Sequence, residues 1–427
     1  MNERVDVERC AEIARRALEQ GLFEDPDSGH EALLFHDLDM MRRRLGVFQA
    51  HFPPQTLHAV AVKANPVVSI LKELVQAGAG LECASIEEVH LSLAAGAEPQ
   101  NIVFDSPAKT NAELAQALER GLHLNTDNFD ELGRIEALMA QRQTPSAAVI
   151  GVRVNPQVGA GKIAATSVGA RVSKFGLPLD ASRQEIVDAF GRWPWLTALH
   201  IHVGSQGCSL EQLILGAERL MVLVEEIEAA HGQGRVTHLD IGGGLPVIYR
   251  TGFKPPTVAK YVEKLTEAVP QLMSGRYRLL TEFGRSIHAG CGFAVSRVEY
   301  VKRHGDAQMA VVHLGADFLM RPVYNPQDWF HEFALLDAQG HPKEGDGGAW
   351  SVVGPLCFGG DIIGRQVPLP KVEVGDWIVI RDTGAYTLGM WSRHCSRGQP
   401  AVIGVEGDVL RTLRKRESPA DMVRYWS

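Results

Sequence analysis

The hydrophobic pattern alternates between two periods from about residue 57 onward, with short apolar runs followed by stretches of helical spacing. Strands are predicted to begin near Leu57, Leu81, Asn101, His123, Ala148, Thr197, His238 and Arg278. Most segments between them carry apolar residues at helical spacing and end at glycine, as VVSILKELVQAGA does. Eight such strand–helix units over roughly 230 residues predict an α/β protein whose parallel sheet closes into a (β/α)8 barrel.

The pattern changes after about residue 290, where β-rich segments such as AQMAVVHLG and DWIVIRDTG are separated by turns. The segment EALLFHD near the N-terminus predicts one more strand that can pair with them. We therefore expect two domains: a barrel over residues 37–290 and a β-sheet domain over residues 1–36 and 291–427. The stretch Gly159–Lys174 is rich in Gly, Ala and Ser, which is typical of either a mobile active-site loop or an ordinary surface loop.

Composition and charge narrow the class of function. Of 427 residues, 45% are hydrophobic, and the net charge of -8 argues against nucleic acid or an anionic membrane surface as the partner. The N-terminal segment lacks the apolar centre of a signal peptide, and no stretch is long enough to span a bilayer. The six cysteines include no C-x-x-C pair, so neither a metal site nor a disulfide framework is predicted. We expect a cytoplasmic protein that acts on a small molecule.

Polar residues gather where the predicted strands end, which is where (β/α)8 barrels carry their chemistry. The apolar run AVAV ends in Lys63, and a lysine at a buried strand end needs a partner or a task. After later strands, HLDIGGG supplies glycines whose backbone N–H groups can cradle a phosphate, and TEFGRSI supplies Glu282 and Arg285. An amine, a phosphate cradle and a carboxylate that can hold a protonated ring nitrogen are the parts of a pyridoxal 5'-phosphate (PLP) site.

Short motifs run through nearly the whole chain in a specific order: VKAN at 62–65, SKFG at 173–176, HVGSQ at 202–206, DIGGG at 240–244, EFGR at 282–285, GPLC at 354–357 and GAY at 384–386. In these motifs the chain resembles the fold-type III PLP-dependent decarboxylases, the group of diaminopimelate, ornithine and arginine decarboxylases. It is most similar to diaminopimelate decarboxylase. The resemblance implies a barrel like that of alanine racemase, a more distant relative, joined to a decarboxylase β domain.

The resemblance also implies roles for individual residues. Lys63 bonds covalently to the cofactor, His202 lies against one face of its ring, and Glu282 holds the proton of the ring nitrogen. Residues expected around the phosphate are Ser205, Gly243, Gly244, Gly284, Arg285 and Tyr386, and those expected near the ring are Glu82 and Arg153. Cys357 is expected to reach the active site of the partner subunit and to donate a proton there, so that two chains form a homodimer with shared active sites.

The chain departs from the family where the substrate side chain is expected to bind. The residue after the cysteine is acidic in the diaminopimelate and ornithine enzymes and meets the distal amine, but here it is Phe358. Phenylalanine cannot pair with an ammonium group, so such a substrate needs Asp361 or Asp317 to replace the acid from another direction. Arg321 matches the family's substrate-carboxylate arginine, which favours a distal carboxylate or another anion.

Smaller departures surround this one. Tyr324 lies one residue closer to Arg321 than the family's RP-x-x-Y pattern would place it. Phe283 stands where the family usually has proline, and we expect this change to be tolerated. His394 and Cys395 replace the common residues after GAY, and the sequence assigns them no function. The residues expected to contact substrate are Arg285, Arg321, Tyr324, Phe358, Asp361 and Tyr386.

The resemblance and the departures together predict PLP-dependent decarboxylation of an amino acid or an amino-acid-like metabolite. Diaminopimelate stays a candidate, although Phe358 favours an altered side-chain specificity. An amino-acid racemase or epimerase on the same scaffold is one alternative, which the cysteine and the GAY motif disfavour. A catalytically inactive regulatory homologue is another, and it would be expected to lack the lysine, phosphate or ring-nitrogen groups that this chain retains.

Overall fold

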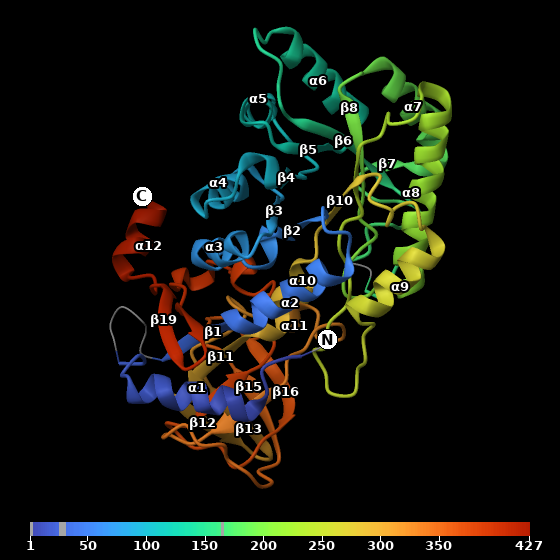
Figure 1. The fold of residues 1–427 in the computed structure, drawn as a ribbon. Helices are drawn as coiled ribbons and strands as arrows, with labels where there is room; N and C mark the ends of the chain where they lie inside the picture. Colours follow the sequence, from blue (N-terminus) through green and yellow to red (C-terminus); the bar gives the residue numbers. More distant parts are fainter. Residues whose placement is uncertain (1–2, 25–30, 164–165) are drawn as a thin grey trace. The chain divides into compact units, whose positions relative to one another are not determined.

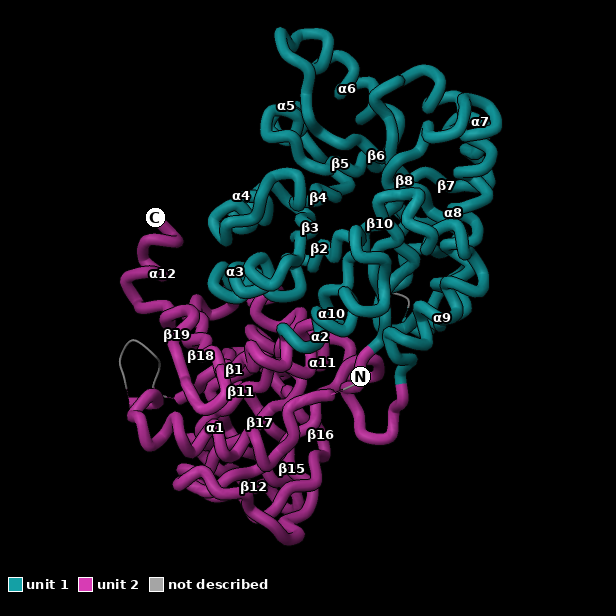
Figure 2. Tube along the Cα trace, in the orientation of Figure 1, with its two compact units in different colours: residues 1, 42–246, 255–286 teal, residues 2–41, 247–254, 287–427 magenta. Residues whose placement is uncertain are grey.

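The computed structural model describes residues 3–24, 31–163 and 166–427. The chain divides into two compact units (Figure 2). Unit 1 contains Arg42–Pro246 and Pro255–Ser286, and unit 2 contains the chain up to Met41, Val247–Lys254 and Ile287–Ser427. The short segment Val247–Lys254 thus interrupts the part of the sequence that forms unit 1, and the hydrophobic pattern alone does not indicate this interruption.

Unit 1 is built on a closed barrel of parallel strands. They are β2 (Leu57–Ala61), β3 (Gly80–Cys83), β4 (Ile102–Phe104), β5 (His123–Thr126), β6 (Val149–Asn155), β8 (Leu196–Ile201), β9 (His238–Asp240) and β10 (Arg278–Thr281). The order β5-β4-β3-β2-β10-β9-β8-β6 is closed by pairing of β5 with β6, and the short strand β7 (Leu177–Pro178) extends it at β6. The predicted (β/α)8 barrel is confirmed.

Helices lie on the outer side of these strands (Figure 1). They are α3 (Val68–Gln76), α4 (Ile86–Ala94), α5 (Asn111–Arg120), α6 (Phe129–Ala140), α7 (Leu179–Arg192), α8 (Leu210–His231) and α9 (Val258–Ala268), while α2 (Leu38–His51) precedes the barrel and α10 (Gly284–His288) follows it. Local sequence sets their ends. Helix α5, for example, begins with a capping box between Thr110 and Glu113 and ends at Gly121, whose φ of 73° suits glycine.

Unit 2 contains two β-sheets. The strands of the six-stranded sheet, in order, are β14 (Phe333–Leu336), β17 (Trp377–Ile380), β11 (Gly292–Arg297), β1 (Ala32–Asp37), β18 (Ala401–Glu406) and β19 (Val409–Arg414). Those of the four-stranded sheet are β12 (Tyr300–His304), β13 (Ala307–Val311), β15 (Ala349–Val353) and β16 (Ile362–Pro368). Strand β1 is the strand that the segment EALLFHD predicts, and it pairs with both β11 and β18.

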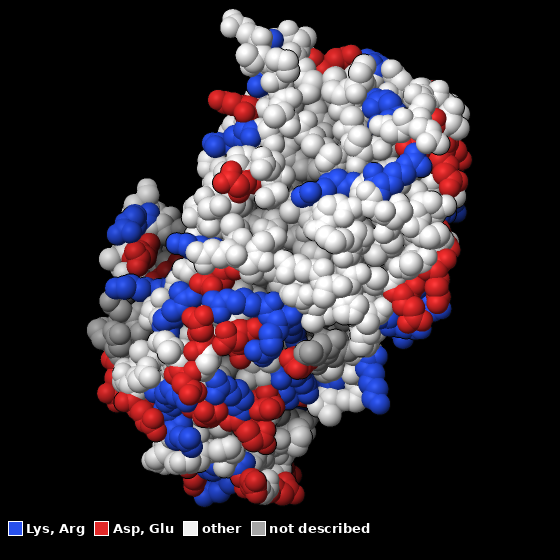
Figure 3. Space-filling model, in the orientation of Figure 1, with Lys and Arg blue, Asp and Glu red and all other residues white. Residues whose placement is uncertain are grey.

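Short helices complete unit 2: α1 (Val7–Glu19), α11 (Met320–Tyr324) and α12 (Pro419–Trp426). Helix α12 was not predicted, although Ser418 and Asp421 form a capping box at its start. Across the described residues on the face drawn in Figure 3, basic and acidic side chains are intermixed, which is typical of a solvated surface. Among the described residues, no helix combines the length and the apolar character needed to cross a bilayer.

The predicted loop Gly159–Lys174 lies between β6 and β7. Its described part contains no α-helix or extended strand, but Ser167 forms an isolated bridge with Gly204, next to the HVGSQ motif. Residues 164–165 of this loop lie outside the described residues. The mobility of the loop stays a prediction.

Candidate functional site

Lys63 follows strand β2 in a single 3-10 turn, Val62–Ala64, that brings its side chain beside the next strand. Its Nζ atom lies 2.6 Å from Oε1 and 2.5 Å from Oε2 of Glu82 in β3. The Lys63 side chain is 38% exposed, whereas that of Glu82 is fully buried. Burial raises the pKa of Glu82 to about 8, although the neighbouring ammonium opposes the shift. The amine is therefore accessible and has a proton acceptor in contact with it.

Three buried carboxylates gather at this end of the barrel. Glu82, Asp105 and Glu282 each place an oxygen within 4.8 Å of the others. Burial is the largest influence on Asp105 and would raise its pKa, but the attractions of Arg153, whose Nη1 lies 2.9 Å from Oδ2, and of His200 and Lys63 together lower that pKa. Asp105 and Arg153 thus form a buried ion pair beside the other two acids.

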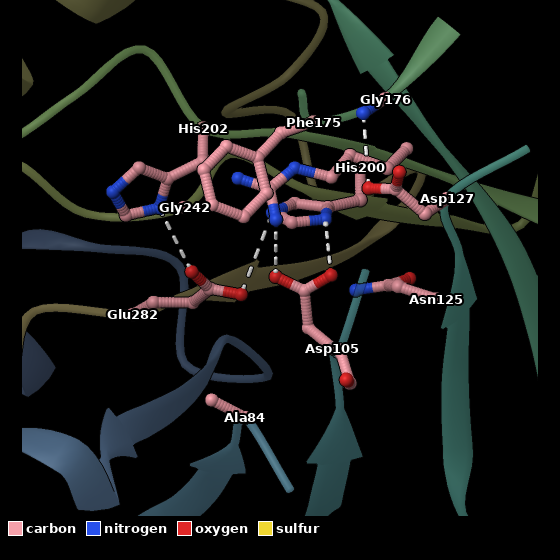
Figure 4. Close-up of polar contacts among 12 residues, drawn as sticks. Ala84, Asp105, Asn125, Asp127, Phe175, Gly176, His200, His202, Gly242 and Glu282 are labelled. Atoms are coloured by element: carbon pink, nitrogen blue, oxygen red, sulfur yellow. Dashed lines mark hydrogen bonds and ion pairs between the residues drawn. The ribbon is translucent and has the colours of Figure 1, made fainter. Parts of the chain in front are cut away.

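Glu282 follows β10 and is held by two histidines from β8 and its end (Figure 4). Nδ1 of His202 lies 2.9 Å from its Oε2, and Nε2 of His200 lies 3.5 Å from its Oε1. Although burial opposes ionisation, the attraction of His200 and His202 holds the pKa of Glu282 well below its usual range. A buried, ionised carboxylate that accepts hydrogen bonds is suited to bind a protonated ring nitrogen.

The glycine loop after β9 packs tightly against the loop after β10. A Cβ atom on Gly243 would lie 2.5 Å from the carbonyl oxygen of Glu282, and one on Gly244 would lie 2.3 Å from that of Gly204. Arg285 donates from Nε to Ser205 Oγ at 3.2 Å, and a Cβ atom on Gly284 would lie 2.9 Å from the Cβ atoms of Ala61 and Ala64. Glycine backbone, a hydroxyl and a guanidinium are groups that bind phosphate.

Unit 1 thus brings together the predicted cofactor residues Lys63, Glu82, Arg153, His202, Ser205, Gly243, Gly244, Glu282, Gly284 and Arg285 at the carboxyl ends of the barrel strands. The amine, the ionised acid and the glycine loops fit PLP. The fit is one of donor chemistry: an amine for the aldehyde, an anion for the ring nitrogen and hydrogen-bond donors for the phosphate.

The remaining predicted residues lie in unit 2. The guanidinium of Arg321 lies over the rings of Trp329 and Tyr386, at 4.6 and 4.7 Å from their centroids. Phe358 is parallel to Tyr324, with ring centroids 6.0 Å apart and planes at 8°. His394 meets Phe358 edge-on, with centroids 6.2 Å apart.

Cys357 and Cys395 are exposed free thiols, whereas the other four cysteines are buried. The backbone N–H of Cys357 donates to Sγ of Cys395 at 3.4 Å. We call Tyr324, Phe358 and His394 the aromatic cluster. Phe358 directly follows Cys357 in sequence, and His394 directly precedes Cys395.

The two acids that a substrate with a distal amine would need in place of residue 358 already have partners within the chain. Asp361 accepts the N–H of Ala316 at 2.6 Å on one oxygen and that of Leu356 at 2.7 Å on the other. Asp317 is fully buried: its Oδ1 accepts the N–H groups of Gly315 and Phe318, and its Oδ2 faces Nε of Arg397 at 3.5 Å. Both carboxylates stabilise turns, and neither is presented for an ammonium group.

Sequence reasoning missed Asp105 and His200. Both carry signals in hindsight: Asp105 stands at the end of β4 in FDSP, and His200 lies two residues before His202 on the same strand face. It also missed Asp240, the first residue of DIGGG, whose pKa is raised well above its usual value by burial and by Glu282. Strand-end position and period-two alternation would have found all three.

Comparisons with known proteins point to a pyridoxal-dependent enzyme. The family model for the pyridoxal-binding domain of pyridoxal-dependent decarboxylases matches residues 38–289. The diaminopimelate decarboxylase of Pseudomonas aeruginosa is 34% identical over 369 residues, covering 85% of this chain and 84% of that protein. That of Vibrio cholerae is 31% identical over 361 residues, covering 84% and 83%.

Solved structures give the same family likeness. The crystal structure of diaminopimelate decarboxylase from Helicobacter pylori complexed with L-lysine has a TM-score of 0.84 at 26% identity, covering 96% of this chain and 99% of that one. A lysine/ornithine decarboxylase from Vibrio vulnificus complexed with cadaverine has a TM-score of 0.77 over 94% of this chain and 100% of its own. Its identity of 21% indicates a shared fold alone.

Proposed function

Because the chain belongs to the family of pyridoxal-dependent decarboxylases, we propose that it removes the α-carboxyl group of an amino acid whose distal group is uncharged or anionic. The enzyme is a PLP-dependent carboxy-lyase, and the proposal concerns its substrate and the roles of its residues. The observation that carries it is the replacement of an acid by Phe358 within the aromatic cluster.

When bound, PLP withdraws electrons from the bonds at the substrate's α-carbon, which allows the carboxyl group to leave as CO2. Lys63 supplies the amine that holds the cofactor, and Glu82 takes up the proton that Lys63 Nζ must lose before it can react. Glu282, whose pKa is held low and which His202 contacts, would accept a hydrogen bond from the ring nitrogen, and His202 would lie against the ring. Ser205 and Arg285, with the glycine backbone, bind the phosphate, and Tyr386 is proposed as a further phosphate contact.

The substrate side chain is proposed to meet the aromatic cluster. An ammonium group there would lose water without gaining a carboxylate, because Asp361 and Asp317 are already engaged by backbone N–H groups. Arg321 is proposed to bind a substrate carboxylate, its guanidinium being held between two aromatic rings. An apolar, amide or carboxylate distal group suits these surroundings better than a free amine.

A CO2-release screen tests this proposal directly. D- and L-amino acids, including meso-diaminopimelate, ornithine, lysine and their uncharged or anionic analogues, are each incubated with the holoenzyme. Preference for a substrate without a distal ammonium is expected. Comparable turnover of diaminopimelate would refute the altered specificity while leaving decarboxylation intact. Loss of optical rotation without CO2 release would instead indicate a racemase or epimerase.

The active unit is proposed to be a homodimer in which Cys357 donates a proton in the partner's site. The exposure of its thiol supports this role. Lys63→Ala should lack the borohydride-reducible chromophore, and Cys357→Ala should keep it but lose turnover. If the sites are shared, mixing the two inactive variants should restore roughly a quarter of wild-type activity through hybrid dimers. No restoration, under conditions where subunits exchange, would assign each site to one chain.

A further inference from the structure

His200 has a position that the reaction as described does not explain. It lies in β8, fully buried, two residues before His202. Its Nδ1 atom faces Oδ1 of Asp105 at 3.6 Å, and its Nε2 atom faces Oε1 of Glu282 at 3.5 Å (Figure 4). One imidazole ring therefore spans two carboxylates that belong to different barrel strands.

These four facing atoms make no hydrogen bond among the described residues, since both ring nitrogens and both facing oxygens are buried without a partner. Buried polar atoms are nearly always paired, and clusters of unpaired ones occur at functional sites. Hydrogen bonds in an active site are often long before the ligand binds and shorten in the loaded state. A contraction of about half an ångström would bring both contacts into hydrogen-bond range. Because both carboxylates only accept, donation to both requires the imidazolium form of His200, whose pKa burial lowers and the two carboxylates raise.

The carboxylate of Asp105 is held on its other side. Arg153 holds the other oxygen of Asp105 at 2.9 Å and is itself buried. The carboxylate of Glu282 is held likewise by His202, which contacts its second oxygen at 2.9 Å. The contacts form a continuous row in space, in which N–H-bearing groups alternate with carboxylates. Its members, in order, are Arg153, Asp105, His200, Glu282 and His202.

We propose that His200 is a positioning residue that links Asp105 to Glu282 and thereby fixes the orientation and the negative charge of the carboxylate that holds the cofactor's ring nitrogen. This inference rests on the proposed role of Glu282. The ring of His200 does not touch the reacting atoms, and it acts through Glu282. The charged and histidine groups around His200 are Asp105, Glu282, Arg153, His202 and His123. Loss of either contact lowers the affinity of the ring nitrogen for its proton.

Three substitutions separate this role from simple filling of the barrel core. Glutamine can place an amide nitrogen near Nε2 and keep the contact to Glu282, whereas asparagine can replace Nδ1 and keep the contact to Asp105. His200→Gln and His200→Asn therefore each retain half of the link, and His200→Leu retains neither. Asp105→Asn tests the link at Asp105. His58→Gln is the matched control, because His58 is another buried barrel histidine that binds Thr281 Oγ1 at 2.8 Å.

The measurement is the 15N resonance of the ring nitrogen in holoenzyme loaded with 15N-labelled PLP, followed from pH 6 to 10. In His200→Leu and Asp105→Asn the pH at which this nitrogen loses its proton should fall by about one unit, which corresponds to tenfold weaker proton binding. In His200→Gln and His200→Asn the pH at which the ring nitrogen loses its proton should also fall. His58→Gln should match wild type, and the double variant Asp105→Asn/His200→Leu should shift no further than the larger single shift.

Some outcomes overturn the inference. An unchanged resonance in a His200→Leu protein that melts like wild type would make His200 a core residue. Wild-type behaviour of His200→Gln would show that the contact to Glu282 suffices and that no link to Asp105 exists. If His200→Leu does not fold, the amide variants and Asp105→Asn decide. A wild-type protein without a protonated ring nitrogen would instead overturn the proposed role of Glu282.

Discussion

Lys63 and Glu82 form an ion pair across two neighbouring barrel strands, with Nζ within 2.6 Å of both carboxylate oxygens. The acid lies in β3, and the register pairs it with Ala61, two residues before the lysine. Its burial raises its pKa to about 8, so the group changes charge in the range where the enzyme can be assayed. This contact connects the pH of the medium to the reactivity of the amine.

Glu82→Gln should slow the reaction of Lys63 with PLP, because an amide cannot accept the ammonium proton. In wild type the rate of chromophore formation from apoenzyme should rise as pH passes about 8, where the carboxyl group ionises. The variant should lack this rise and react roughly 100-fold more slowly above it. Stopped-flow absorbance across pH 6–10 measures both, with the exposed Glu87→Gln as control. A variant with the wild-type profile would exclude Glu82 as the proton acceptor.

Gly243→Ala should weaken cofactor binding and stability together. The added Cβ would lie 2.5 Å from the carbonyl oxygen of Glu282, so the loop after β9 must move away from the residue that binds the ring nitrogen. A destabilisation of about 1–3 kcal/mol is expected. Gly133→Ala in α6 is the control, since nothing lies within 4 Å of its added Cβ and alanine favours the helix. Equal PLP affinity in both variants would contradict the close packing of Gly243 against Glu282.

Much of the barrel was predictable because its signals are local. Each apolar run predicts a strand, and the polar residues that follow it predict where the strand ends. The motifs around Lys63 and Glu282 are two such ends. The link through His200 was not predictable in the same way. Asp105, His200 and Glu282 come from β4, β8 and β10, and they meet only because closure of the barrel brings these strand ends together.

The expectation for Asp361 shows a second limit. Its sequence position near Cys357 suggested a substitute acid, yet both of its oxygens accept backbone N–H groups. Which partner an acidic side chain takes depends on the turn around it, and local composition does not specify that turn. The position of β1, by contrast, was predictable: EALLFHD predicts a strand that pairs with the later β segments, and β1 lies between β11 and β18.

His58→Gln should make unfolding of the apoenzyme less sensitive to acid. Burial lowers the pKa of His58 to about 4, whereas an unfolded histidine titrates near 6.5. Its contribution to stability is therefore complete above pH 6.5 and is lost as pH falls toward 4. The free energy of unfolding should fall by up to about 3 kcal/mol more in wild type than in the variant over this range. Urea denaturation at several pH values measures it, with the exposed His51→Gln as control. Parallel curves for wild type and His58→Gln would contradict a buried neutral imidazole.

Phe358→Glu should restore turnover of substrates that carry a distal ammonium. The change places an acid where the family resemblance implies one, beside Tyr324 and His394. A charge-assisted hydrogen bond of about 1.5–3 kcal/mol would raise kcat/KM for diaminopimelate or ornithine by roughly 10- to 100-fold and lower it for an anionic analogue. Steady-state CO2 release with both substrates gives the ratio, and Phe358→Leu controls for loss of the ring. If Glu and Leu at this position shift the ratio equally, the charge at residue 358 does not select the substrate, and selectivity must then be sought around Arg321.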